Sequence, residues 1–124
     1  MRYDVVIIGA GAAGFGCALT LGSANDKFDW AKDKKYLILD DNKSDLNVGK
    51  YFNVAGVDSG INGVDLLLKM KKQLEIYKDV ELKDEKATKI EDLGEYFKIT
   101  TQNSNYEASI VVLATGLHKF DIEC

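Results

Sequence analysis

The stretch that decides the fold is YDVVIIGAGAAG, at residues 3–14. Residues 3–9 contain a continuous β-branched run, which is typical of a strand buried on both faces of a parallel sheet. Glycines and alanines follow, and residues 15–21 have the pattern of a helix that we expect to end at Gly22 and Ser23. A strand that turns through glycines directly into a helix predicts the first βα unit of an α/β fold.

The turn between this strand and this helix fits the pattern GxGxxG. Its residues are Gly9, Ala10, Gly11, Ala12, Ala13 and Gly14. In such a turn the first glycine permits a tight bend, the second lets a pyrophosphate approach the backbone, and the third lets the helix pack closely on the strand. The N–H groups of the first helical turn and the helix dipole then attract the diphosphate. Between a strand and a helix, the motif indicates a dinucleotide-binding loop.

A second predicted strand, residues 36–40, ends in the carboxylates Asp40 and Asp41. A carboxylate at this position can accept hydrogen bonds from the hydroxyls of an adenosine ribose, and it would repel the 2′-phosphate of NADP. The separation between Gly14 and Asp40 is longer than the ~20 residues usual between the glycine motif and such an acid. The polar insertion at residues 25–35 accounts for the extra length. We prefer Asp40 for this role, with Asp41 as the alternative.

The middle of the chain predicts two irregular stretches and one helix. In the loop at residues 25–35, we expect Phe28 and Trp30 to pack against the fold. Residues 41–60 are irregular, and residues 63–78 form a helix. The apolar stripe of this helix consists of Leu67, Met70, Leu74 and Tyr77, and its solvated lysines are Lys69, Lys71 and Lys72.

The second half of the chain predicts strands. A short strand at residues 80–82 precedes an antiparallel meander of residues 87–93, 95–101 and 105–109. A last strand, apolar on both faces, is expected at residues 110–115. The fold class is therefore α/β and Rossmann-like, with a central parallel sheet, flanking helices and a three-stranded meander, in one domain over residues 1–124.

Length and composition argue against several classes of protein. The 124 residues carry a net charge of −4 and 46% hydrophobic residues, which predicts one domain and argues against nucleic-acid binding. No apolar run reaches the ~18 residues of a membrane span, and Asp4 interrupts any secretion signal. Cys17 and Cys124 form no CxxC pair, so we expect a reduced, cytoplasmic protein.

No catalytic or metal-ligating residues are predicted. The single histidine, His118, is expected in a solvated loop, although it could approach a ligand bound beside it. Cys17 is expected to be a buried structural thiol, and Cys124 could react only through exposure. One histidine and dispersed acids assemble neither a metal site nor a Ser/His/Asp set.

Three stretches together resemble the flavin-binding half of the thioredoxin-reductase-like pyridine nucleotide–disulfide oxidoreductases. They are residues 3–14, residues 51–73, and the strand at 106–116 that ends in Ala-Thr-Gly. The resemblance implies FAD rather than NAD as the cofactor. It also implies that the backbone of Ala87 or Lys86 contacts the adenine, and that Thr115 and Gly116 close over the dinucleotide.

The chain also departs from this family. Its 124 residues contain no second GxGxxG, no CxxC and no returning segment to contact the flavin ring, and residues 117–124 lack the usual proline. The sequence therefore predicts the FAD-binding component of a split or longer flavin-dependent oxidoreductase, with a homodimer or a separate NADPH-domain chain as possible partner. One alternative is a stand-alone, non-catalytic module that binds FAD or NAD. Another is a remnant that keeps the fold and binds nothing tightly.

Overall fold

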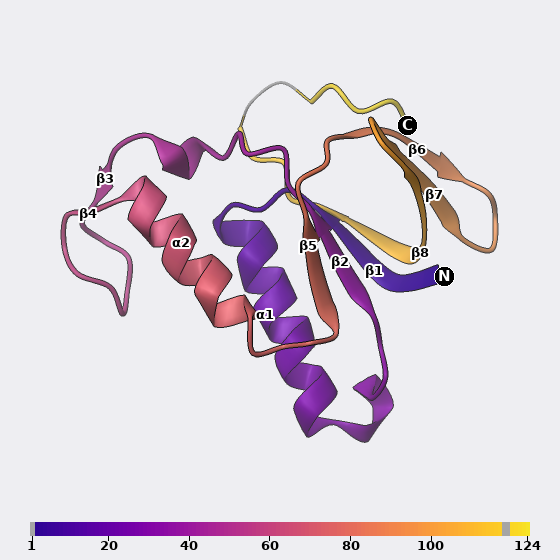
Figure 1. Cartoon of the computed structure of the whole chain (residues 1–124), viewed down its shortest axis with the longest axis horizontal. Helices are drawn as coiled ribbons and strands as arrows, with labels where there is room; N and C mark the ends of the chain where they lie inside the picture. Colours follow the sequence, from indigo (N-terminus) through magenta and orange to yellow (C-terminus); the bar gives the residue numbers. More distant parts are fainter. Residues whose placement is uncertain (1, 118–119) are drawn as a thin grey trace.

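The computed structural model describes residues 2–117 and 120–124, which form two helices and eight strands (Figure 1). In chain order the elements are β1 (Arg2–Ile8), α1 (Ala12–Lys27), the 3-10 helix η1 (Asp29–Ala31), β2 (Tyr36–Leu39), the 3-10 helix η2 (Asp45–Asn47), β3 (Lys50–Tyr51), β4 (Ile61–Asn62), α2 (Gly63–Leu74), β5 (Val80–Lys83), β6 (Ala87–Asp92), β7 (Phe97–Thr101) and β8 (Asn105–Leu113). His118 lies outside the described residues, so its predicted loop position stays a prediction.

Six of the strands form one mixed sheet in the order β5-β2-β1-β8-β7-β6. The strands β5, β2, β1 and β8 are parallel neighbours, whereas β8, β7 and β6 run antiparallel. Val5 in the central strand pairs with Tyr36 on one side and with Ile110 on the other. The α/β fold class with a central parallel sheet, flanking helices and a meander is therefore confirmed.

Each face of the sheet is covered by a different layer. On one face, α1 packs on β1 and β2 while α2 lies beside α1, and Phe15, Ala18 and Leu74 fill the space between helices and sheet (Figure 1). On the other face, Ile99 and Ala108 of the meander pack against the strands. The strands β1 and β2 are therefore buried on both faces, as their apolar sequences predict.

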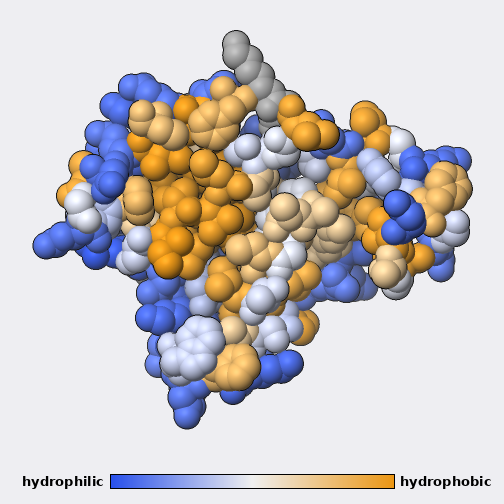
Figure 2. Space-filling model, turned by 180° about the vertical axis from the view of Figure 1, so that it is seen from behind, coloured by the Kyte–Doolittle hydropathy of each residue, from blue (hydrophilic) through white to orange (hydrophobic). Residues whose placement is uncertain are grey.

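The meander and the parallel part of the sheet share one strand, which differs from the prediction. The segments at 105–109 and 110–115, expected as two strands, form the continuous strand β8. Apolar side chains of this strand are not all buried, because Ile110 is 55% exposed and Leu113 is 51% exposed. The helix α1 packs mainly over β1 and β2, which leaves Ile110 of β8 without a helix above it. Figure 2, which views the molecule from behind, shows a broad apolar area on that face.

The helix α1 continues past its predicted end at Gly22 and Ser23 and stops at Lys27. Gly22 is buried, and a Cβ atom there would lie 2.8 Å from Cγ of Tyr77. The glycine therefore makes room for an aromatic ring from the segment after α2 instead of ending the helix.

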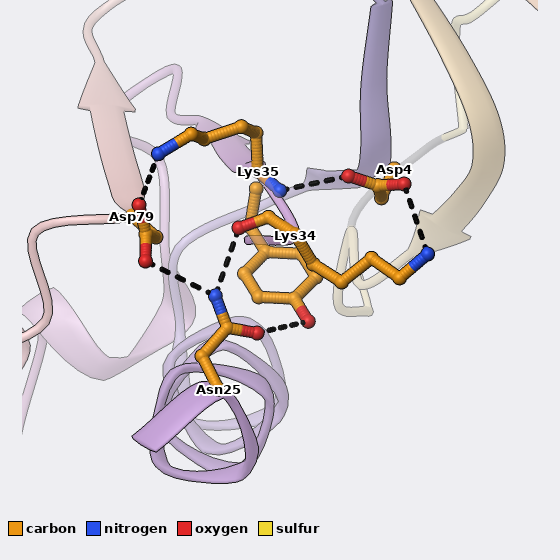
Figure 3. A network of polar contacts seen from close by, with 6 residues as sticks. Asp4, Asn25, Lys34, Lys35 and Asp79 are labelled. Atoms are coloured by element: carbon orange, nitrogen blue, oxygen red, sulfur yellow. Dashed lines mark hydrogen bonds and ion pairs between the residues drawn. The ribbon is translucent and has the colours of Figure 1, made fainter. Parts of the chain in front are cut away.

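A polar network explains why the last turn of α1 is ordered (Figure 3). Asn25 is only 8% exposed, and its amide nitrogen donates to the Lys34 carbonyl at 2.8 Å and to Asp79 at 3.2 Å. Its amide oxygen accepts from the Tyr36 hydroxyl at 2.8 Å. The Lys35 side chain is paired with Asp79. Buried polar groups are stable only when bonded in this way, and here the bonds join the end of α1 to the segments preceding β2 and β5.

Phe28 and Trp30 do not pack against the fold, so that prediction is wrong. Phe28 is 51% exposed and Trp30 is 74% exposed, and their rings stack on each other with centroids 5.6 Å apart. Both aromatic residues follow the end of α1 at Lys27, with Phe28 as the N-cap of η1 and Trp30 within it.

The second helix, α2, ends at Leu74 rather than Lys78. Asn62 caps its N-terminus by accepting from the Asp65 amide at 2.8 Å. The predicted apolar stripe packs inward through Leu74, and Leu66, 2% exposed, joins it. The solvated positions of Lys69, Lys71 and Lys72 are confirmed. Neither helix in the described part of the chain is long and apolar enough to cross a membrane.

Candidate functional site

The glycine turn lies between β1 and α1, and backbone contacts surround two of its glycines. Gly9 has φ +109°, and a Cβ atom on it would lie 2.1 Å from the Ala114 carbonyl oxygen. A Cβ atom on Gly14 would lie 1.8 Å from the Gly9 carbonyl oxygen. Real Cβ atoms essentially never approach within 3.0 Å, so only glycine fits either position.

Gly11 differs from these two glycines, because what lies over it is a side chain. A Cβ atom there would lie 2.9 Å from Oγ of Ser44, and its φ of −95° is open to any residue. The first hydrogen bond within α1 runs from the Phe15 amide to the Gly11 carbonyl at 3.0 Å. The preceding amides of the first turn therefore have no acceptor inside the helix, and they carry the positive end of its dipole.

The predicted acids lie beside this turn at the end of β2. The Gly9 amide donates to the Leu39 carbonyl at 2.9 Å, which places the residues after β2 next to the loop. The Asn42 amide donates to Oδ1 of Asp40 at 2.9 Å. Burial raises the pKa of Asp40, and the nearby charges of Asp84 and Asp41 raise it further. Asp40 is half-buried and lines the cavity described below.

The connection between β5 and β6 supplies a further part of the site. Ala87 begins β6 and is 3% exposed. Glu85 accepts from the Thr101 hydroxyl at 2.6 Å and from the Tyr106 hydroxyl at 2.7 Å, and these bonds lower the pKa of Glu85. Both of its oxygens are thus engaged by the meander, and the carboxylate anchors the wall that holds Ala87.

The Ala-Thr-Gly sequence, residues 114–116, directly follows β8 and forms a further part of the site. The Ala114 amide donates to the Ile8 carbonyl at 2.8 Å, which brings Thr115 beside the glycine turn. Gly116 has φ +79°, a backbone conformation that favours glycine. The Leu117 amide then donates to Asp45 at 3.3 Å, linking this end to the loop after β2.

These segments enclose one cavity of about 480 Å³, within the usual range of roughly 300–1,000 Å³ for ligand pockets. Ten of the eleven predicted site residues line it; these are Gly9, Ala10, Gly11, Ala12, Ala13, Asp40, Asp41, Ala87, Thr115 and Gly116. Gly14 does not line it and packs against Gly9 behind the wall. Among the lining residues of the described chain, five are acidic and Lys86 alone is basic.

The cavity also contains residues that sequence reasoning missed. Ser44 lies over Gly11, and Phe120, Asp121 and Ile122 form part of the wall. A serine just before a short helix is a helix-capping signal that could have drawn attention to Ser44, which caps η2. No sequence signal marks Phe120, because its place in the wall depends on how the chain folds back after Gly116.

The cysteines lie outside this cavity. Cys17 is half-buried, it packs against the core between helices and sheet, and burial raises the pKa of its thiol. Cys124 is exposed at the end of the chain. Among the described residues, no group of three or more His, Cys, Asp or Glu side chains is arranged to hold a metal ion.

Comparison with known proteins decides the family. The model of the family described as pyridine nucleotide-disulphide oxidoreductase matches residues 3–124. The chain belongs to this family. The resemblance to thioredoxin-reductase-like members is also confirmed, because relatives and solved structures of that kind cover nearly the whole chain.

Two curated relatives show how much of such proteins the chain represents. It is 32% identical over 114 residues to a thioredoxin reductase of Treponema pallidum (strain Nichols), covering 92% of this chain and 35% of that protein. It is 26% identical over 123 residues to a probable thioredoxin reductase of Arthroderma benhamiae, covering 94% of this chain and 28% of that protein. The chain thus spans about a third of the length of the curated relatives it matches.

Solved structures agree in fold. A thioredoxin reductase from Gloeobacter violaceus matches with a TM-score of 0.82 at 27% identity, covering 96% of this chain and 38% of that one. Lactococcus lactis thioredoxin reductase matches with a TM-score of 0.79 at 32% identity, and the match covers 96% of this chain and 37% of that one. The sheet, helices and meander described above therefore form a unit that occurs within larger reductases.

Proposed function

We propose that this domain binds FAD and is the flavin-binding component of a thioredoxin-reductase-like oxidoreductase. The observation that carries the proposal is the meeting of the glycine turn and Asp40 at the carboxyl ends of the neighbouring strands β1 and β2. Ligands of open α/β sheets bind at this edge. Family membership and the meander that precedes the last parallel strand favour FAD over NAD.

The residues fit the ADP portion of such a cofactor. The amides of the first turn of α1 would donate to the pyrophosphate, with Gly11 leaving the space that the phosphates need. Asp40, or alternatively Asp41, would accept hydrogen bonds from the ribose hydroxyls. The backbone of Ala87 or Lys86 would contact the adenine, and Thr115 and Gly116 would lie over the dinucleotide.

When bound, the flavin supplies the redox chemistry, by accepting hydride from a nicotinamide and passing electrons on. This chain's residues would bind and orient the cofactor. We propose that a nicotinamide-binding domain with a CxxC pair comes either from the remainder of a longer protein or from a separate chain. A homodimer is a further possible arrangement.

The proposal is tested by the cofactor content of the purified protein. We expect the visible absorption of oxidised flavin after gentle purification, or after reconstitution with FAD, and calorimetric titration should show FAD binding more tightly than NAD. A protein that cannot be loaded with FAD would overturn the proposal. Binding of NAD instead would favour the stand-alone dinucleotide module.

A matched pair of glycine variants assigns the binding to the cavity. Gly11→Val should abolish FAD binding while the protein stays folded, because its φ of −95° tolerates valine and the added side chain enters the space beside Ser44. Gly16→Ala is the control, since nothing lies within 4 Å of a Cβ atom at that position. If Gly11→Val still bound FAD like the wild type, the glycine turn would not be the phosphate site.

A further inference from the structure

The segment at residues 120–123, called the strap below, runs along the edge strand β6 and forms one wall of the cavity. The Ile90 amide donates to the Glu123 carbonyl at 2.7 Å, and the Glu123 amide donates to the Thr88 carbonyl at 3.0 Å. These bonds form a parallel bridge between Lys89 and Glu123. Both hydrogen bonds hold Glu123, the last residue of the strap, against β6 through the backbone and independently of side chains.

The apolar side chains of the strap play different parts. Ile122 packs against the same core cluster that holds Ala87. Phe120 also lines the cavity, but it remains 46% exposed. A large planar ring on a cavity wall that leaves nearly half of its surface uncovered offers a face for a planar ligand to stack on.

The strap is also tied to the segment that precedes Ala87. Asp121 forms an ion pair with Lys86, the neighbour of Ala87. This hydrogen bond raises the pKa of Lys86, and the nearby Asp41 carboxylate raises it further. Asp40, Asp41 and the strap residues 120–122 line the same cavity. A base attached to a ribose that is held by Asp40 or Asp41 would therefore lie in the cavity that the strap borders.

We propose that the strap is a recognition element for the base of the dinucleotide, with Phe120 as the aromatic platform on which the adenine stacks and Ile122 as its apolar support beside Ala87. The inference rests on the proposed function, which supplies the nucleotide, and it adds residues outside the glycine turn and the Ala-Thr-Gly sequence. Stacking of a base on an aromatic side chain contributes about 1–3 kcal/mol when measured by alanine substitution.

The test compares AMP, which carries the base, with ribose 5-phosphate, which lacks it. Phe120→Ala should weaken AMP binding roughly 5- to 150-fold and leave ribose 5-phosphate binding unchanged, and Phe120→Tyr should restore AMP binding. Leu117→Ala is the matched control, because Leu117 is 97% exposed, nearby in the chain and absent from the cavity wall. AMP binding of this control should equal that of the wild type.

A second variant uses tryptophan fluorescence to detect contact between the base and the strap. Trp30 is the single tryptophan, and it lies in the η1 turn between α1 and β2, so Trp30→Phe with Phe120→Trp places the only indole on the strap. AMP should quench its fluorescence, whereas ribose 5-phosphate should not.

The outcomes separate the two proposals. The inference is overturned if the wild type binds AMP while Phe120→Ala binds it equally well, or if AMP binds without quenching the indole. Equal losses for AMP and ribose 5-phosphate would also overturn it, because they would indicate a structural effect. If the wild type binds neither AMP nor FAD, the proposed function fails as well.

Discussion

Two glycines of α1 have opposite surroundings, and the structure predicts opposite effects of the same substitution. Gly14→Ala places a Cβ atom 1.8 Å from the Gly9 carbonyl oxygen, well inside the 3.0 Å limit of real Cβ contacts. Because the neighbour is backbone at the end of β1, the helix must move away from the strand, and overpacking of this kind costs about 1–3 kcal/mol. Gly16→Ala meets nothing within 4 Å and lies in an exposed helix interior, where alanine stabilises by about 0.8–1.0 kcal/mol over glycine.

The two variants should therefore differ by about 2–4 kcal/mol in the free energy of unfolding. At about 4 °C per kcal/mol for a chain of this size, their midpoints of thermal unfolding should lie roughly 8–16 °C apart, on either side of the wild type. Circular dichroism melts of the three proteins without added nucleotide measure this difference, with urea titrations as an independent check. A Gly14→Ala protein at least as stable as the wild type, or a Gly16→Ala protein less stable than it, would refute the close packing described for this helix.

Three further predictions concern polar groups. Burial raises the pKa of Asp40, so the affinity for AMP, measured by calorimetry, should fall as the pH drops through this raised pKa. The Asp40→Asn protein should bind AMP weakly at every pH. If the AMP affinities of the wild type and of Asp40→Asn changed with pH in the same way, Asp40 would not hold the ribose. The Lys35 and Asn25 hydrogen bonds lower the pKa of Asp79, so the stability that this carboxylate contributes is present above its unfolded-state pKa and is lost as the pH falls through the lowered value. Asp79→Asn should thus cost up to about 1 kcal/mol in urea unfolding at neutral pH and progressively less in acid, and a penalty independent of pH would exclude the ion pair as its cause. Asn62→Ala removes the cap of α2 and should cost about 1 kcal/mol, and an unchanged urea midpoint would show that the cap contributes nothing.

The sequence was sufficient for the fold because its strongest signals are local. The β-branched run of β1 leads directly into the glycine turn, and this order alone predicts a parallel βα unit and the place of a phosphate. Reliance on local signals also explains the wrong prediction that the first helix ends at Gly22. A glycine after a helical pattern indicates a helix end, but here it accommodates Tyr77, which lies far along the chain.

The remaining differences also arise from contacts between distant segments. The division of β8 into two predicted strands failed because its antiparallel and parallel partners, β7 and β1, are not visible in its own sequence. Ser44 and Phe120 reach the cavity only after the chain has folded back on itself. Their types, a serine in a polar loop and a phenylalanine near the end of the chain, are common on ordinary surfaces.

The pairing of β1 with β8 has a consequence for the order in which the chain is made. Val5 is synthesised well before Ile110, so the second edge of its strand stays unpaired until Ile110 has been made. Until then the nascent chain carries an open, β-branched strand edge, the kind of surface that associates with other chains. The contact between Gly9 and the Ala114 carbonyl forms at the same late moment, so the glycine turn gains its last wall only when the sheet is complete. A nucleotide that needs this wall would bind finished sheets and not partial ones, and it would stabilise the strand that joined last.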